Sequence, residues 1–170
     1  MRTPLTYCTA CAARLDGSRP HPVCTGCGRT HFRDPKVGVG VVAHDGSGRL
    51  LLVRRAVDPG KGLWALPAGF VDADEDPRAA AAREALEETG LVVEVGAVVD
   101  VYPVPGPGGA SFFLAFEAEV VGGTLAAADD ALDARFFAAD ELPQLAFDST
   151  LDAARRTGRG QPGAPGEAGA

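Results

Sequence analysis

The chain has 170 residues, of which 46% are hydrophobic and 23% charged, and its formal net charge is −7. This length allows one well-packed domain and a small additional module. No stretch approaches the roughly 20 apolar residues of a membrane-spanning helix, and residues 1–17 lack the apolar run of a signal peptide, so we expect a cytoplasmic protein without a membrane partner. The negative charge argues against broad affinity for nucleic acid. It does not exclude a phosphorylated small molecule, because a metal ion can reverse the local field.

All four cysteines lie near the N-terminus, as two Cys-x-x-Cys pairs separated by twelve residues: Cys8, Cys11, Cys24 and Cys27. Each pair can present two thiolates to one tetrahedral ion, so this spacing predicts a structural Zn²⁺ site with no open coordination position. Two disulfides are the alternative, and they would need an oxidising compartment. We assign residues 1–34 to a zinc ribbon.

The remaining residues of this module offer little for a second function. Residues 1–33 carry five arginines against Asp16 alone, a side-chain balance of +4, which zinc with four thiolates would reduce to about +2. Binding of nucleic acid by the ribbon is therefore the less favoured alternative. His21 and His31 exceed the four ligands that zinc needs, and we expect them at the surface or in the hinge.

Strand patterns and turns alternate after Asp34-Pro35, where the proline favours an extended boundary. A hairpin turn is expected at 45–48. The sequence from about 134 to 145 predicts a short strand followed by a one-turn helix. Apolar or alternating segments rich in valine and phenylalanine, typical of strands, lie at about 37–43, 49–55, 63–71, 92–104 and 110–121.

Two helices are predicted among these strands. Asp76 is a suitable N-cap, Pro77 suits the first helical turn, and Gly90 can end the helix in a left-handed conformation. A second helix is expected over about 149–157. Strands before and after a central helix indicate a layered α/β fold. Residues 158–170 have almost no apolar side chain larger than alanine, which predicts a disordered tail.

The segment 69–91 is strongly acidic, because only two arginines offset seven carboxylates. At about 100° per residue, Glu84, Glu87 and Glu88 fall in one arc of the helix. We expect Ala79, Ala82 and Leu86 to form the opposite face, which packs on the sheet. Bunched carboxylates repel one another unless a cation intervenes, and oxygen ligands suit Mg²⁺ or Mn²⁺. A solvated acidic face is the alternative.

The spacing of this segment resembles the Nudix box at every fixed position. The box reads glycine, five residues, glutamate, seven residues, then Arg-Glu, an aliphatic residue, any residue, Glu-Glu, any residue, glycine and an aliphatic residue. In this sequence it corresponds to Gly69, Glu75 and 83–91, with Ala85 in the first aliphatic position. The chain therefore resembles the Nudix hydrolases over residues 36–157.

This resemblance implies an α/β/α sandwich with a mixed sheet, which we assign to residues 35–157, and metal-assisted attack of water on a nucleoside diphosphate linked to another group. Glu84 and Glu88 would be the principal metal ligands, and Glu87 a ligand or the base. The family also uses a main-chain carbonyl, here of Ala68 or Gly69. Arg83 and Glu75 would hold the glutamates in place by ion pairing.

Other site residues are assigned with less support. Some Nudix enzymes take their base from a later loop, where Asp130 is our choice and a plain turn acid is the alternative. Arg54 and Arg55 end a strand, and one could contact a phosphate, although a solvated strand end fits equally well. Phe70, Tyr102 and Phe112 could stack on a base or flavin ring, with ordinary core packing as the alternative for each.

Two zinc-ribbon groups of Nudix proteins compete as the subgroup. NADH pyrophosphatases carry a Ser-Gln-Pro-Trp-Pro-Phe-Pro-x-Ser motif after the box, which residues 101–111 echo only in Tyr-Pro-Val-Pro. The segments 31–36, 63–70 and 135–147 resemble the other group, whose substrates are ADP-ribose and FAD. The resemblance thus implies AMP and a phosphorylated partner as products, and it allows a homodimer. An oxidised-nucleotide hydrolase and a nucleotide-sensing or RNA-binding regulator remain alternatives.

Overall fold

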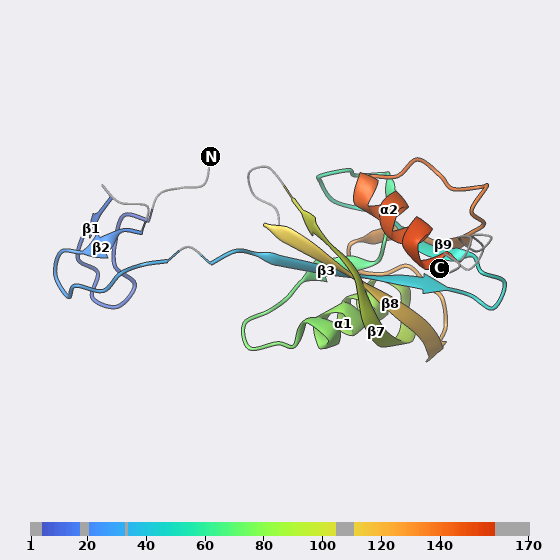
Figure 1. Cartoon of the computed structure of the whole chain (residues 1–170), viewed down its shortest axis with the longest axis horizontal. Coiled ribbons are helices and arrows are strands. Elements are labelled where there is room, and N and C mark those ends of the chain that lie inside the picture. Colours follow the sequence, from blue (N-terminus) through green and yellow to red (C-terminus); the bar gives the residue numbers. More distant parts are fainter. Residues whose placement is uncertain (1–4, 18–20, 33, 105–110, 159–170) are drawn as a thin grey trace, which may run out of the picture.

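The computed structural model describes residues 5–17, 21–32, 34–104 and 111–158 (Figure 1). In the N-terminal module, β1 (Leu15–Asp16) pairs antiparallel with β2 (Val23–Cys24). Figure 1 shows this module at one end of the long axis and the α/β sandwich at the other. The predicted disordered tail lies outside the described residues from position 159 onward.

A mixed sheet forms the centre of the second part. Its strand order is β5-β4-β3-β8-β7, with β6 paired to β3 and β9 paired to β4. Among the strands that the structure describes, β3 and β8 run parallel and the other neighbours run antiparallel. The strands are β3 (Val37–His44), β4 (Leu50–Arg55), β5 (Trp64–Ala65), β6 (Ala68–Phe70), β7 (Leu91–Pro103), β8 (Phe112–Gly123) and β9 (Ala131–Phe137).

The helices α1 (Pro77–Thr89) and α2 (Asp148–Thr157) cover opposite faces of this sheet (Figure 1). Alanines of α1 pack with Val39, Val41 and Phe116. On the other face, Ala153 of α2 packs with a second cluster that includes Val42 and Leu52. Neighbouring residues of a strand point to opposite faces, so β3 contributes to both clusters. The expected α/β/α sandwich is confirmed.

The ends of α1 are built as the sequence predicted. The Asp76 carboxylate accepts hydrogen bonds from the backbone N–H groups of Arg78 and Ala79, and Pro77 occupies the first helical turn. Gly90 ends the helix at φ 69°, and a Cβ there would lie 2.6 Å from the carbonyl oxygen of Thr124. These caps fix the register of the helix and therefore the direction of its glutamates.

Two predicted elements differ from the structure. The apolar segment 63–71 forms two short strands, β5 and β6, separated by Pro67, which cannot donate a ladder hydrogen bond. The one-turn helix expected after β9 is absent from residues 138–147, which form turns and extended chain. In place of helical bonds, Ala146 donates its N–H to the Trp64 carbonyl, and Trp64 donates to that of Gln144.

Candidate active site and metal centres

Arg83 is the centre of an ion-pair network on α1. Its Nε and Nη2 donate to the two carboxylate oxygens of Glu75, each at 2.9 Å. Nη1 donates to Glu84 at 2.8 Å and to Glu87 at 3.0 Å, and Nη2 also donates to the Phe70 carbonyl at 3.0 Å. The bonds from Arg83 hold the pKa of Glu75 down, at about 2. One guanidinium thus fixes three of the box glutamates relative to one another.

Glu84 lies directly against the backbone of β6. A Cβ built on Gly69 would overlap the Glu84 carboxylate, so the first residue of the box can only be glycine in this arrangement. Burial raises the pKa of Glu84, and the nearby charges of Glu87 and Asp129 add to this rise against the opposing effect of Arg83.

Glu88 is the most buried acid of the box, with only 4% of its surface exposed. Its carboxylate accepts the N–H of Ala68 at 2.9 Å. Burial raises the pKa of Glu88 to about 7, and the negative charge of Glu84 contributes in the same direction. The Glu88 carboxylate is therefore largely shielded from water. It has one N–H donor, from Ala68, and the negative charge of Glu84 lies nearby.

The packing face predicted for α1 was wrong. The buried helix residues are Ala80, Ala81, Ala85, Glu88 and Thr89, whereas Leu86 is 47% exposed. The glutamates therefore do not all project away from the sheet. A helical wheel could not show this, because the hydrogen bond from Ala68 to Glu88 joins residues twenty positions apart.

The loop between β8 and β9 brings further acids to this place. Ala126 donates its N–H to the Thr89 carbonyl at 2.9 Å, and Ala128 donates to that of Glu88 at 3.2 Å. The loop then carries Asp129, at φ 52°, and Asp130 past the end of α1. The charge of Asp130 is one of the causes that raise the pKa of Glu88. Asp130 thus lies in the region where the sequence placed a second base.

Phe70 and Tyr102, two of the residues predicted to contact substrate, both have partners within the protein. The Phe70 ring is 43% exposed, with the Lys36 ammonium 4.8 Å from its centroid. Tyr102 lies in the α2-side cluster, and its hydroxyl donates to Asp152 of α2 at 2.8 Å. Burial and that bond raise the pKa of Tyr102 to about 12. These contacts make Tyr102 a link between β7 and α2, which favours the packing alternative.

Phe112 and Arg54 show no arrangement that singles them out. Phe112 is half-buried at the start of β8, where it pairs with Val37. Arg54 is exposed, and its Nε donates to the Gly62 carbonyl at 2.9 Å. Their roles in substrate binding stay predictions.

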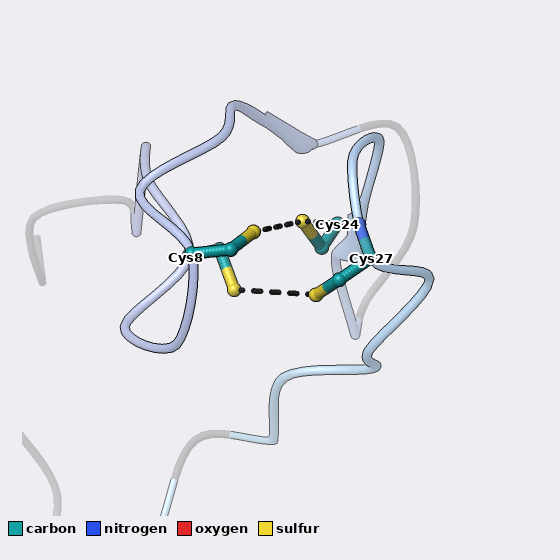
Figure 2. A group of neighbouring side chains, drawn as sticks. Cys8, Cys24 and Cys27 are labelled. Atoms are coloured by element: carbon teal, nitrogen blue, oxygen red, sulfur yellow. Dashed lines mark hydrogen bonds between the residues drawn. The ribbon is translucent and has the colours of Figure 1, made fainter.

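The four cysteines converge in the N-terminal module, and Figure 2 shows the side chains of Cys8, Cys24 and Cys27 facing one another across two turns. All four Sγ atoms lie within 4.8 Å of one another, with Cys8 and Cys27 at 3.7 Å and Cys11 and Cys24 at 3.4 Å. None is in a disulfide. Sulfur atoms around a tetrahedral zinc at Zn–S of about 2.3 Å would lie about 3.8 Å apart.

Backbone donors also favour thiolates at this place. Cys27 and Gly26 donate N–H groups to the Cys24 sulfur at 3.3 and 3.4 Å, and these bonds lower the pKa of Cys24 to about 6. Gly28 has φ 73°, the left-handed conformation that the second turn requires. The spacing, the free sulfurs and the donors all fit a zinc ion.

His31 was expected at the surface or in the hinge, and this prediction was wrong. It is only 8% exposed, and its Nε2 lies 3.3 Å from the Cys8 sulfur. A hydrogen bond from a buried imidazole to a ligand sulfur orients that ligand. The sequence carried no signal for this contact, because the Cys-x-x-Cys pairs already account for four ligands.

The glutamates also fit a metal, although less tightly. Carboxylate oxygens and a main-chain carbonyl of 68–69 form the hard oxygen set that Mg²⁺ or Mn²⁺ prefers. Glu88 is buried beside the negatively charged Glu84, so a bound cation would offset the repulsion between the two carboxylates. Within the described part of the chain, however, the cysteines are the single group of three or more Cys, His, Asp or Glu side chains that lie close enough together to share a metal ion. Arg83 holds Glu84 and Glu87, whereas Glu88 accepts the N–H of Ala68, so the carboxylates have different partners in the protein.

Comparison with known proteins places this geometry in a family. The NUDIX domain family matches residues 34–157. The chain is 43% identical over 120 residues to the ADP-ribose pyrophosphatase of Methanocaldococcus jannaschii, which covers 69% of this chain and 70% of that protein. It is 29% identical over 170 residues to the NAD-capped RNA hydrolase NudC of Pseudomonas aeruginosa, which covers 94% of this chain and 60% of that protein.

Among solved structures, a NUDIX hydrolase from Nitrosomonas europaea superposes with a TM-score of 0.79 at 30% identity. This match covers 93% of the chain and 95% of that structure. The chain belongs to the Nudix hydrolases, enzymes that act on pyrophosphate bonds. Across the described residues, no helix has the length and apolar character to span a membrane.

Proposed function

We propose that this enzyme hydrolyses the pyrophosphate bond of ADP-ribose or FAD, giving AMP and a phosphorylated partner, in a reaction that depends on Mg²⁺ or Mn²⁺. The observation that carries this proposal is the Glu88 carboxylate, buried beside Glu84 and against the backbone of β6. Such a site is stabilised by a divalent cation that also binds phosphate oxygens. The choice of substrate is supported by the name of the Methanocaldococcus jannaschii relative.

Each box residue has a separate part in this proposal. Glu84 and Glu88 would ligate the cation together with the carbonyl of Ala68 or Gly69, and Glu87 would ligate it or act as the base. When bound, the cation neutralises charge on the pyrophosphate and lowers the pKa of the attacking water. Arg83 and Glu75 hold the glutamates in register without contacting the substrate.

Proton transfer has two candidates, and their positions differ. Glu87 has a side chain that is 44% exposed and is already bound to Arg83. Asp130 lies on the loop beside Glu88. It forms no ion pair with any residue that the structure describes. We therefore keep Asp130 as the alternative base, and the pair Glu87→Gln and Asp130→Asn would distinguish them by which variant loses more kcat.

The substrate's aromatic group has one well-placed candidate partner. Phe70 directly follows Gly69 in the box and offers an exposed ring. Because neighbouring residues of a strand point to opposite faces, the Phe70 side chain points away from the Gly69 side that faces Glu84, so a base or flavin ring stacked on it would lie across β6 from that carboxylate. Phe70→Leu is expected to raise KM several-fold, because a stacked ring contributes about 1–3 kcal/mol.

The NudC similarity favours one second candidate. That alignment includes the N-terminal module as well as the Nudix domain, so hydrolysis of NADH or NAD is the alternative substrate choice. We also propose the division of the chain into a zinc ribbon at 1–34 and a catalytic domain at 35–157. A homodimer stays a prediction, which sedimentation of the full chain would test.

Assays of the purified chain with ADP-ribose, FAD, NADH and 8-oxo-dGTP in Mg²⁺ would test the proposal. We expect the highest kcat/KM for ADP-ribose or FAD, with AMP as a product and ¹⁸O from labelled water in one of the two phosphates. Glu88→Gln is the control for contaminating activity. Absence of Mg²⁺-dependent turnover on every substrate would overturn the proposal, and a clear preference for NADH would replace its substrate.

A further inference from the structure

Arg55 is turned toward the face of the sheet that carries the box. The pairing of β4 with β9 shifts register between Arg54 and Arg55, so that Arg54 pairs with Asp133 and Arg55 with Ala131. Ala131 packs with Val53. Since paired residues of neighbouring strands share a face, Arg55 lies on the side of Val53, and Arg54 lies on the opposite side.

Two contacts hold the Arg55 guanidinium. Its Nε donates to the Pro59 carbonyl at 2.7 Å, and its central carbon lies 5.2 Å from the centroid of the Phe147 ring. The side chain is half-buried. Neither contact uses the two terminal amino groups, and these make no hydrogen bond or ion pair within the part of the chain that the structure describes.

Two backbone hydrogen bonds connect the end of β4, where Arg55 lies, to the end of α1, which carries the box glutamates. Ala56, its neighbour, donates to the Asp130 carbonyl at 2.8 Å, and Ala128 donates to that of Glu88 at 3.2 Å. The same three-residue loop segment thus joins the end of β4 to the end of α1.

We propose that Arg55 binds the diphosphate of the substrate, with its terminal amino groups donating to phosphoryl oxygens beside the box glutamates and with Phe147 holding the guanidinium plane. This inference rests on the proposed function, whose site it completes with a cation of the protein itself. A guanidinium can donate two parallel, charge-assisted hydrogen bonds to one phosphate group. This inference replaces the phosphate contact considered for Arg54, which is exposed on the other face and donates to the Gly62 carbonyl.

The adjacent arginines supply a matched pair of variants. We expect Arg55→Gln to weaken the binding of inorganic pyrophosphate in Mg²⁺, measured by titration calorimetry, by about ten- to a hundredfold, since hydrogen bonds to charged groups contribute about 1.5–3 kcal/mol. Arg54→Gln should change it by less than about twofold, as an exposed charge does. Arg55→Lys keeps the charge but loses the Pro59 bond and the ring contact, and it should fall between the two.

Further readouts separate substrate binding from a purely structural role. Arg55→Gln should raise KM for the preferred nucleotide far more than it lowers kcat, leave binding of adenosine unchanged, and keep the midpoint of thermal unfolding. Phe147→Leu should weaken pyrophosphate binding only a few-fold, in the range of a cation–π contact.

The test distinguishes this inference from the proposed function. Turnover of ADP-ribose or FAD with equal pyrophosphate affinity in the two glutamine variants would overturn the role of Arg55 and leave the proposed function intact. Absence of turnover on any nucleotide would overturn the proposed function, while the pyrophosphate titrations would still decide about Arg55. A wild-type chain that binds no pyrophosphate in Mg²⁺ would overturn the inference as well.

Discussion

The ribbon and the Nudix box both gather metal-ligand side chains, but they are built in opposite ways. In the ribbon, four sulfurs from two turns meet within 4.8 Å of one another. In the box, Arg83 holds Glu75, Glu84 and Glu87, and Glu88 is held separately by the Ala68 N–H. A closed sulfur set leaves no place for a substrate, whereas carboxylates spread around a protein cation keep ligand positions that a cation and a phosphate can share.

The comparison also separates two uses of a metal. Few of the residues described in the ribbon are buried, so we predict that this module would depend on zinc for folding. The box rests on a sheet whose two faces pack into hydrophobic clusters, and burial of apolar side chains stabilises this region. Removing metal should therefore unfold one region and inactivate the other.

Loss of a ribbon ligand should give the largest effect. Cys24→Ser is expected to abolish the fold of the described ribbon residues, because zinc supplies about 10–16 kcal/mol of folding free energy in comparable small domains. Zinc content by mass spectrometry and amide NMR spectra would measure this. The signals of the α/β sandwich should persist, and kcat should stay within a few-fold. Unchanged ribbon signals in a zinc-free variant would contradict the structural role.

Neutralising Glu88 should come next and should affect only activity. Glu88→Gln keeps the shape and an acceptor for the Ala68 N–H but removes a ligand charge, so kcat should fall by about a thousandfold. The midpoint of thermal unfolding should stay the same or rise, because a buried neutral amide avoids the cost of burying charge. Glu94→Gln, at an exposed position of β7, is the matched control. A loss of kcat below tenfold would remove Glu88 from the ligand set.

The imidazole behind the ribbon cysteine should have a smaller effect. His31→Phe removes the group 3.3 Å from the Cys8 sulfur and is expected to weaken zinc binding by about tenfold, as loss of such outer partners typically does. Competition with a chromophoric chelator would measure the affinity. His21→Phe is the control, since the His21 ring packs on Phe32 at 4.8 Å and does not contact a ligand in the described contacts. Equal effects of both changes would indicate general packing instead.

The sequence predicted those parts of the site that depend on spacing along the chain. Caps at Asp76 and Gly90 determine where α1 begins and ends. The spacing of the box residues along the chain then allows Arg83 to reach Glu75 and Glu84. The same reasoning located both Cys-x-x-Cys pairs. Local geometry decides these features, so a single sequence is sufficient for them.

Features that depend on distant partners were missed. The burial of Glu88 follows from contact with β6, the hydroxyl bond of Tyr102 joins residues fifty positions apart, and the pairing of Arg55 with Ala131 depends on a register shift between β4 and β9. None of these partners has a recognisable spacing in the sequence. Side-chain periodicity gives the expected face of an isolated helix or strand, and tertiary hydrogen bonds then select which residues are buried.

The smallest effect should come from the ion pair that organises the box before any cation binds. Arg83 lowers the pKa of Glu75 to about 2, below the value near 4.3 of an unfolded chain. A carboxyl whose pKa is lower in the folded state stabilises the fold above its unfolded pKa, and this contribution is lost as the pH falls toward the folded pKa. Glu75→Gln should therefore lower the midpoint of thermal unfolding by about 2 °C at pH 7.

That difference between wild type and Glu75→Gln should narrow between pH 4.5 and pH 2, which calorimetric scans at several pH values would show. Asp74→Asn is the control, because Asp74 is an exposed neighbour at φ 65° that asparagine tolerates. It should lower the midpoint by less and show no narrowing over the same range. A pH-independent difference for Glu75→Gln would mean that its bonds to Arg83 and to the Asp72 N–H stabilise the loop by shape alone.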